Sequence, residues 1–485
     1  MNTKSNEFPK KNKAMGKKTD LLIAIGAILF AVLFYKQTTG LNYLIFSVIY
    51  ALLNLFFNKE NLNKTWYLTY GLHFLCAFNI FNVNTNLAVW AWVISLIFVI
   101  GKTFETKNSF ILTSFFSLAS TVSAFGVMFK KYFVLKKEET NKPKLLYLGA
   151  ILVSFVLVLI FFFLYKGANP LFDDLTKKID LSWFDIPFIF FTLLGFWICF
   201  IFVYPYVNQN NSLWDKNKLA ELKIEDEDQN TSSKQFVGLI AILVFICLNI
   251  MLLSLNILDI KSIFVLEKLP ENIFLSDFLH FSVWSIVFSI ILAIILIVGI
   301  QQFKIKNKLI KILIYTWIFQ SLIMVVNTFI RNYWYSFNQI TYLRIGVFVF
   351  LSMCIFGLIY TAYCIFKKRN YWFLLNLNLN TWLYVLVFTS IFSWDRIITT
   401  HNLKFEKIDQ IDMQYLSSLS ENNVDLLAEF YVKHSDLFEQ YGYNRSTLTQ
   451  DLLWKKHLFL WKMERKSWQS YNLTDKMKYK NLKLN

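Results

Sequence analysis

The chain has 485 residues, of which 56% are hydrophobic and only 17% are charged, and 51 of them are phenylalanine. Soluble domains carry about a quarter charged residues, so this composition excludes an ordinary soluble enzyme. A dozen bilayer-length segments of roughly 20 residues would use about half of the chain. The net charge of +17 must then lie in the loops and ends outside the membrane, where a basic excess indicates topology more often than nucleic-acid binding.

Twelve apolar runs lie along the chain, and each is a candidate membrane helix. The last seven are long enough to cross a bilayer, whereas the first four have only 15 to 17 residues. At 1.5 Å per residue these four cover about 25 Å, which is short of a roughly 30 Å hydrocarbon core. Continuous runs disfavour a β-barrel, so the predicted fold class is all-α, a polytopic transmembrane helical bundle of 11 or 12 spans with a small helical tail. The runs are Leu21–Tyr35, Leu41–Phe57, Trp66–Phe81, Leu87–Gly101, Phe110–Phe129, Leu145–Tyr165, Ile186–Val207, Phe236–Ile257, Phe278–Ile300, Leu309–Ile330, Arg344–Phe366 and Trp372–Ser393.

The pattern divides the chain into four regions. Residues 1–20 are a basic N-terminal segment, 21–130 hold the short membrane helices, 145–393 form the main bundle and 394–485 are a polar helical tail. In the tail, apolar residues recur at helical spacing from Ile411 to Leu419, from Val424 to Tyr431 and from Trp454 to Trp468. Ser420 is placed to cap the second of these helices. Three short helices make only a small core, so we expect them to pack on one another and on the membrane face.

The distribution of basic residues predicts the topology. Sixteen lysines and arginines lie in the loops after the fifth, seventh, ninth and eleventh runs, against seven in the loops between them. The positive-inside rule therefore places the first set in the cytoplasm and the tail on the outer face of a bacterial cytoplasmic membrane. Six lysines before Leu21 also favour a cytoplasmic N-terminus, which twelve full spans do not permit. We expect eleven spans, with one short early run failing to cross.

Polar and ionisable residues near helix ends gather in the loops assigned to the outer face. Three arginines there can pair with acids at the same depth, for which Glu267, Asp277 and Asp395 are the candidates. Such pairs usually lock helix ends together, and the alternative is a polar cavity in which Arg331 and Arg344 hold an anionic ligand. The candidate polar face comprises Asn169, Asp277, His280, Asn327, Arg331, Arg344, Asp395 and Arg396.

Two pairs of residues on helices invite a closer interpretation. Asn327 and Arg331 lie four residues apart at the end of a predicted helix, where a capping role is expected. His73 and Cys76 are one turn apart, but a structural zinc needs four N or S ligands and no second pair is near, so a buried, hydrogen-bonded histidine is predicted. The sequence contains no P-loop, GxGxxG, HExxH or Ser-His-Asp arrangement. No catalytic, cofactor-binding or metal-binding residue is therefore predicted, and we do not expect an enzyme.

The C-terminal stretch from Lys455 to Asn485 has nine basic residues against Glu464 and Asp475, interleaved with tryptophan and tyrosine. Beside a membrane this mixture favours lipid headgroups over nucleic acid. Membrane lipids are the expected partners, an envelope protein or an anionic ligand is a further candidate, and nucleic acid is not expected.

Several motifs resemble an uncharacterised family of bacterial multi-pass membrane proteins, catalogued as domain of unknown function 4173 and close to 4153. The resemblance runs from about Leu145 to the end of the chain, and it implies no activity, cofactor or catalytic residue. Its motifs are Gly167-Ala168-Asn169-Pro170-Leu171-Phe172, Arg331-Asn332-Tyr333, Thr341-Tyr342-Leu343-Arg344-Ile345-Gly346-Val347, Trp394-Asp395-Arg396-Ile397-Ile398, Asn402-Leu403, Asp412-Met413-Gln414-Tyr415-Leu416-Ser417-Ser418-Leu419-Ser420 and Trp468-Gln469-Ser470-Tyr471-Asn472-Leu473.

The sequence thus favours a non-enzymatic envelope scaffold or sensor whose tail contacts envelope components. The alternative is a transporter or a lipid- or anion-handling protein with a polar site near Arg331 and Arg344. A polar cavity reaching the middle of the membrane would support transport, whereas a sealed apolar bundle with a charged rim would support the scaffold.

Overall fold

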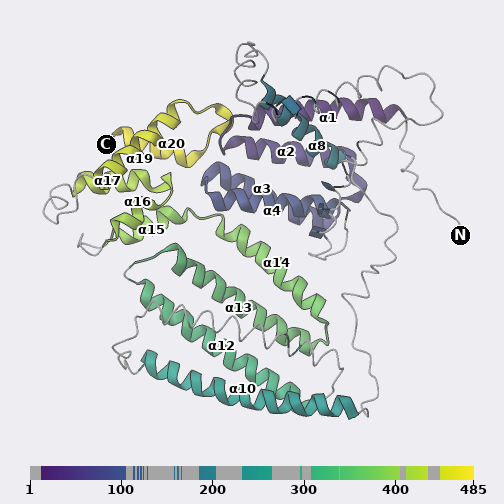
Figure 1. Ribbon diagram of the computed structural model, residues 1–485, viewed down its shortest axis with the longest axis vertical. Helices are drawn as coiled ribbons and strands as arrows, with labels where there is room; N and C mark the ends of the chain where they lie inside the picture. Colours follow the sequence, from purple (N-terminus) through teal and green to yellow (C-terminus); the bar gives the residue numbers. More distant parts are fainter. Residues whose placement is uncertain are drawn as a thin grey trace. The chain divides into compact units, whose positions relative to one another are not determined.

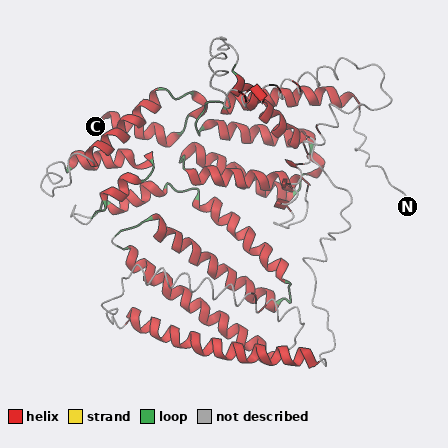
Figure 2. Ribbon diagram, in the orientation of Figure 1, coloured by secondary structure: helices red, strands yellow, loops and turns green. Residues whose placement is uncertain are grey.

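The computed structural model describes residues 13–104, 185–203, 232–264, 307–404, 411–434 and 448–484, apart from 338, with isolated positions between 113 and 165 and at 295 and 297. All regular structure in these residues is helical and none is strand (Figures 1 and 2), which confirms the all-α class. Most of the predicted runs 110–129, 145–165 and 278–300 lies outside the described residues.

Five described helices are long and apolar enough to cross a membrane, so the chain has the helices of a membrane protein. Three further apolar helices are shorter. The five are Asn86–Thr103, Gln235–Lys261, Lys308–Trp334, Tyr342–Phe366 and Tyr371–Thr389, and the shorter three are Thr19–Phe34, Leu41–Phe57 and Pro187–Phe202.

The chain divides into two compact units, and the tail contributes residues to each. Unit 1 comprises Met1–Phe81, Trp92–Gln209 and Ser467–Tyr471, and unit 2 comprises Asn82–Ala91, Asn210–Lys466 and Asn472–Asn485.

Unit 1 is built from short apolar helices whose facing surfaces are rich in aromatic side chains. Buried rings from different helices meet edge to face, as in the pair Tyr50 and Phe202, whose centroids are 4.4 Å apart. Large rings bury much apolar area and give such pairs an additional attraction. The helices are α1 (Lys13–Phe34), α2 (Leu41–Phe57), α3 (Lys64–Asn82), α4 (Asn86–Phe104, whose first six residues belong to unit 2) and α8 (Ile186–Val203).

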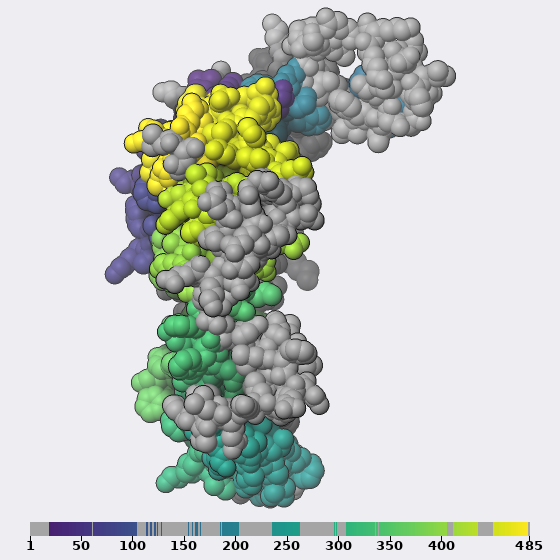
Figure 3. All heavy atoms as spheres, turned by 90° about the vertical axis from the view of Figure 1, so that its left-hand side faces the viewer, coloured from purple at the N-terminus to yellow at the C-terminus, as the bar shows by residue number. Residues whose placement is uncertain are grey.

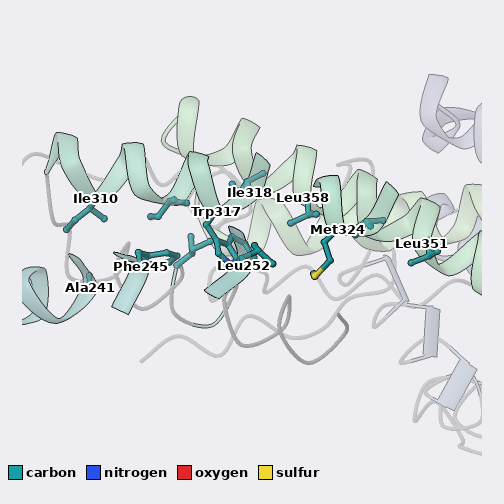
Figure 4. Close-up of a cluster of buried hydrophobic side chains, with 12 residues drawn as sticks. Ala241, Phe245, Leu252, Ile310, Trp317, Ile318, Met324, Leu351 and Leu358 are labelled. Carbon is teal, nitrogen blue, oxygen red and sulfur yellow. The ribbon is translucent and has the colours of Figure 1, made fainter. Parts of the chain in front are cut away.

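Unit 2 contains the longest apolar helices, which pack in chain order. They are α10 (Ser232–Phe264), α12 (Lys308–Ser336), α13 (Tyr342–Phe366) and α14 (Tyr371–Thr389). The side chains of Asn307, Thr341 and Asn370 each accept a backbone N–H at the start of a helix, which satisfies groups that a helix leaves unpaired. Trp317 and Phe245 lie within the apolar cluster to which α10, α12 and α13 contribute (Figure 4).

Four residues separate the end of α14 from the start of the tail in unit 2. Its helices are α15 (Trp394–Asn402), α16 (Met413–Ser418), the 3-10 turn η4 (Glu421–Asn423), α17 (Val424–Lys433), α19 (Leu448–Glu464) and α20 (Leu473–Leu484). The Ser420 side chain accepts the N–H of Asn422, as predicted for a cap, although it caps η4 and not α17 itself. The helix α20 was not predicted, because its buried face carries Asp475 and Lys478 and so lacks an apolar repeat.

The tail helices enclose two small apolar cores. One gathers Ile398, Met413, Leu416 and Leu427, and the other is formed by Val424, Phe459 and Leu482. In Figure 3 the helices α19 and α20, in yellow, lie at the surface that faces the viewer.

Candidate functional site

The candidate polar face is only partly within the described residues. Asn169, Asp277 and His280 lie outside them. Asn327 and Arg331 are on α12, Arg344 is on α13, and Asp395 and Arg396 are on α15, all within unit 2.

Arg331 forms an ion pair with Asp259 of α10, with Nη2 2.9 Å from Oδ1. The side chain of Arg331 is 9% exposed and that of Asp259 is 21% exposed. A guanidinium that is largely removed from water and bonded to a carboxylate is already neutralised. Asp259 is not among the partners that the sequence suggested, because the helical end of α10 extends past the predicted Ile257.

The expected capping role of Asn327 and Arg331 is wrong. The helix α12 continues to Ser336, so both residues lie within the helix and not at its end. The helix continues through Tyr333 and Trp334, whose rings are largely exposed. Tyrosine and tryptophan are enriched at membrane boundaries.

Arg344 is bonded back to its own loop. Its Nη1 donates to the carbonyl of Gln339, and its own carbonyl accepts from Asn332 Nδ2 at 3.1 Å. The loop is bonded in turn to α15, because Asn402 accepts the N–H of Ile340 and donates to its carbonyl, at 2.8 and 2.9 Å. The α12–α13 loop is therefore fastened to the tail.

Asp395 and Arg396 face different partners. Asp395 accepts hydrogen bonds from the hydroxyls of Tyr342, at 2.6 Å, and Ser420. Arg396 pairs with Asp425, with Nη1 2.6 Å from Oδ1, and the Asp425 side chain is only 2% exposed. The sequence proposed arginine partners for Asp395 from the membrane loops, and it missed Asp425 because that residue comes from α17, about thirty positions along the chain.

The segment 417–423 is the centre of the tail, and we call it the cation-capped turn. The carbonyls of Ser417 and Leu419 accept from Lys455 Nζ at 3.1 and 2.8 Å. The last carbonyls of a short helix such as α16 have no partner within the helix, and cations at that end are favoured. Burial lowers the pKa of Lys455 to about 8, although nearby Asp395 and Glu421 act against this.

Two further cations reach the cation-capped turn. Arg396 donates to the carbonyl of Asn422 at 3.1 Å, and Lys478 donates to the carbonyl of Glu421 at 3.3 Å. Lys478 also bonds Asn422 Oδ1 at 3.0 Å and is 1% exposed. Three helices of the tail, α15, α19 and α20, therefore converge on one turn through their basic side chains.

Asp475 supplies the opposite charge. Its carboxylate lies 2.5 Å from Lys466 Nζ and 2.6 Å from Lys478 Nζ. Burial alone raises the pKa of Asp475, but the two ammonium groups outweigh it and hold the pKa well below its usual range. Burial lowers the pKa of Lys478, and the Asp475 carboxylate opposes that change. The sequence analysis counted these residues in the basic C-terminal stretch and assigned that stretch to lipid headgroups, whereas Lys466 and Lys478 pair with Asp475 inside the tail. The signal for this pairing was a charged pair at i, i+3 on the face of α20 that also carries Leu482.

The α3–α4 loop joins the same network within unit 2. Asn84, which has a left-handed φ of 52°, donates to Asp475 at 3.3 Å and accepts from Asn422 Nδ2 through its carbonyl at 3.2 Å. Asparagine tolerates this conformation better than most residues. Thr474 Oγ1 donates to the carbonyl of Asn82.

In unit 1, the segment Ser467–Tyr471 is bonded to the α1–α2 loop. Ser470 Oγ accepts the N–H of Thr38 at 2.9 Å, and the Tyr471 carbonyl accepts the N–H of Leu41 at 2.9 Å. A Cβ at Gly40 would overlap the backbone of Ser470. Only glycine permits this close approach.

His73 is fully buried between two serines in unit 1. Nε2 lies 3.1 Å from Ser47 Oγ and Nδ1 lies 3.0 Å from Ser95 Oγ. Trp92 Nε1 donates to Ser47 Oγ at 2.9 Å. This confirms the prediction of a buried, hydrogen-bonded histidine.

A second polar region runs between α10 and α12, and we call it the α10–α12 seam. Asn249 Nδ2 donates to the carbonyl of Leu313 at 3.0 Å, and Asn256 Nδ2 donates to the carbonyl of Gln320 at 3.0 Å. The partners rise together along both helices toward Asp259 and Arg331, so α10 and α12 run in the same direction. Four buried atoms of the seam have no hydrogen-bond partner among the described residues: Asn256 Oδ1, Gln320 Oε1, Ser321 Oγ and Asn327 Nδ2.

Within the described part of the chain, no three His, Cys, Asp or Glu side chains are grouped so as to hold a metal ion. The hydrogen-bond donors and acceptors of the tail and of the loops bonded to it meet one another inside the protein. The arrangement therefore holds these segments together.

The family comparison agrees with the resemblance seen in the motifs. A domain of unknown function (DUF4153) matches residues 20–430. The chain belongs to this family. The match covers α1 to α4, so the narrower extent expected from the motifs, beginning at Leu145, is wrong, and it ends before α19 and α20. No curated protein and no solved structure matches the chain.

Proposed function

We propose that this protein is a non-enzymatic envelope scaffold with eleven membrane spans, whose tail is a preformed platform on the outer face of the bacterial cytoplasmic membrane. The observation that carries the proposal is that the tail is hydrogen-bonded to the loops of several helix pairs. The charged side chains of the tail are at the same time paired within the protein. Two steps support the proposal: the directions of the helices, and the occupation of the charged groups.

The helix directions in unit 1 follow from the bonds at the helix ends. The tail segment Ser467–Tyr471 is bonded where α1 ends and α2 begins. Asp185, just before α8, bonds Tyr35 and Lys36 at the end of α1, at 2.5 and 3.1 Å. At the opposite ends, Asn58 after α2 donates to the carbonyl of Phe202 in α8 at 2.9 Å. Therefore α1 runs toward the tail, and α2 and α8 run away from it.

In unit 2 the tail is bonded to the α3–α4 loop and the α12–α13 loop, and it continues directly from α14. Asp259 of α10 pairs with Arg331, which lies near the tail-side end of α12. Therefore α10, α12 and α14 run toward the tail and α13 runs away from it, and the α3–α4 loop lies at the tail, which places the end of α3 and the start of α4 there.

We propose that all nine apolar helices named in the two units cross the membrane, including the four short early ones, so the expected failure of one short early run is not retained. Eleven spans then require two further crossings from the apolar runs 110–129, 145–165 and 278–300, most of which lie outside the described residues. Eleven spans place the lysine-rich N-terminal segment in the cytoplasm and the tail outside, which satisfies the positive-inside rule at both ends.

The topology is tested by reporters at both ends of the chain. Alkaline phosphatase fused after Asn485 is expected to be active in a bacterial host, and green fluorescent protein fused before Met1 is expected to fluoresce. An inactive but stable phosphatase fusion would contradict the outer tail. If both reporters lay on one side of the membrane, the number of spans would be even and the eleven-span proposal would be wrong.

The scaffold is favoured over an anion site because both candidate arginines are engaged. Arg331 is bonded to Asp259, and Arg344 is bonded to a carbonyl of its own loop. An anion would have to displace the Asp259 carboxylate from Arg331 at a largely buried site, which would break an ion pair that is already formed.

A complementation experiment separates the two functions. The strain lacking the gene is tested for sensitivity to detergent and osmotic stress, and is complemented with the Arg331→Gln/Asp259→Asn double variant, with Gly40→Val, or with Gly346→Ala as control, since a Cβ at Gly346 meets no atom within 4 Å. A scaffold requires the attached tail, so Gly40→Val is expected to fail while the double variant complements. The reverse result would favour the anion site.

A transporter is the second candidate, and the α10–α12 seam is the observation that favours it. Buried polar atoms without partners inside a membrane helix pair are costly and are often functional. If the seam binds a transported solute, Asn256→Leu should abolish complementation while the protein remains stable and abundant. Normal complementation by Asn256→Leu would count against transport.

A further inference from the structure

The outer faces of α19 and α20 form an exposed amphipathic surface. Leu453, Trp454 and Trp461 lie on one side of α19 and are 47%, 67% and 50% exposed. Leu473 and Met477 lie on the exposed side of α20, at 41% and 46%. The opposite sides of the two helices supply Phe459 and Leu482 to the tail core. Each helix therefore has one apolar side that is buried and a second that is exposed. We call the exposed apolar residues, with the cations below, the tail outer surface.

Cations flank these apolar side chains. The Arg465 guanidinium lies 4.2 Å from the ring centroid of Trp461, and Lys483 Nζ lies 4.6 Å from that of Tyr479. Lys480 is exposed one turn before Lys483. Lys462 and Lys466 of the same region pair with acids of the tail, so they are not counted here. Asp451 and Glu464 are the acids on the exposed side of α19.

The position of this surface identifies its partner. Only four residues separate the tail from the end of α14, and α15 is bonded to the α12–α13 loop, so the tail lies next to the membrane surface. Tryptophan and leucine insert at the boundary between headgroups and acyl chains, and lysine and arginine attract anionic lipids. Because tryptophan and arginine also recur at protein–protein interfaces, it is the position of this surface beside the membrane that favours lipid as the partner.

We propose that the tail outer surface binds anionic phospholipid headgroups of the membrane on which the tail lies. This inference rests on the part of the proposed function that places the tail against the membrane, and not on the number of spans. The apolar side chains enter the interface to a shallow depth, and Arg465, Lys480 and Lys483 contact the phosphates. Lipid binding would hold the platform in one orientation on the membrane.

The test uses the full-length protein in a neutral detergent and measures its thermal unfolding while phosphatidylglycerol or phosphatidylcholine is added. Phosphatidylglycerol is expected to raise the unfolding temperature at lower concentration than phosphatidylcholine. In the variant Arg465→Gln/Lys480→Gln/Lys483→Gln, the concentration for half of the effect should rise at least ~10-fold, because each cation near an anionic surface contributes about fivefold. A matched control, Lys59→Gln/Lys64→Gln/Lys433→Gln, removes three exposed cations elsewhere and should behave as the wild type.

Three results would overturn the inference. They are equal stabilisation by the two lipids, an unchanged response of the triple variant, or an equal loss in the control variant. Since all three variant positions have exposed side chains, the fold is expected to survive, and the unfolding temperature without lipid verifies this. An inactive phosphatase fusion with an intact phosphatidylglycerol response would refute the proposed topology and leave the lipid site standing. An active fusion with no specific response would do the opposite.

Discussion

In the tail, the buried charges of Asp475, Lys478 and Asp425 lie against opposite charges or backbone carbonyls, whereas the α10–α12 seam buries four polar atoms that have no partner among the described residues. Both regions place polar groups where water is scarce. The buried charges of the tail have a structural role, because breaking their contacts would leave unpaired charges inside the protein. The four seam atoms have no such contacts among the described residues, which is why the seam is the observation behind the transporter alternative.

The largest expected effect comes from removing the acid at the centre of the tail. Asp475→Asn leaves the ammonium groups of Lys466 and Lys478 without their carboxylate, and Lys478 is almost fully buried. Removing one member of a buried pair costs about 3 kcal/mol or more. Hydrogen exchange of α20 in the purified protein should show its local opening free energy fall by that amount.

The matched control is Lys462→Gln, which breaks the more exposed pair between Lys462 and Glu421. Exposed pairs contribute about 1 kcal/mol or less. If the two substitutions had equal effects on exchange, the distinction between buried and exposed pairs in the tail would be wrong.

Next in size is a dependence of tail stability on alkaline pH. The pKa of Lys455 is about 8 in the folded protein, against 10.5 for a free lysine side chain. Between these values the unfolded state binds a proton that the folded state has released, so stability rises as the pH increases from about 8 to 10.5. Lys455→Met has no such group and should lack this part of the slope.

The measurement is the difference in unfolding temperature between wild type and Lys455→Met across that pH range. Taking the difference removes the contributions of other tyrosines and lysines. A difference that stays constant, or that changes in the opposite direction, would show that burial in the cation-capped turn does not lower the pKa of Lys455.

The smallest effect is expected in the seam. Ser321→Ala removes a buried hydroxyl that has no partner among the described residues, so stability should be unchanged or increased by about 1 kcal/mol. Thr328→Val removes a hydroxyl that donates to the carbonyl of Met324 at 3.0 Å and should be slightly destabilising. Thermal unfolding of both variants decides the comparison. A clear loss of stability in Ser321→Ala alone would mean that the Ser321 hydroxyl is hydrogen-bonded in the folded protein.

Sequence periodicity predicted the helices well where a long apolar run decides the structure. The run Leu41–Phe57 coincides with α2, and the run Arg344–Phe366 differs from α13 only at its start. Ends defined by polar residues were less accurate, because α10 and α12 extend through Asp259 and Arg331, which pair with each other across the two helices. In the sequence alone, a charged residue next to an apolar run indicates a loop. Only the position of its partner shows that the helix continues through it.

The sequence by itself determined that the chain is helical and apolar enough to cross a membrane, since bilayer thickness and helical rise impose a segment length that is visible in any single run. It also determined which loops are basic, because that count is local. Only the tertiary structure decided which charges meet. Arg396 reaches Asp425, and three cations reach the turn at 417–423, from helices far apart in sequence. Pairing between distant residues depends on how helices pack, and no local pattern records it.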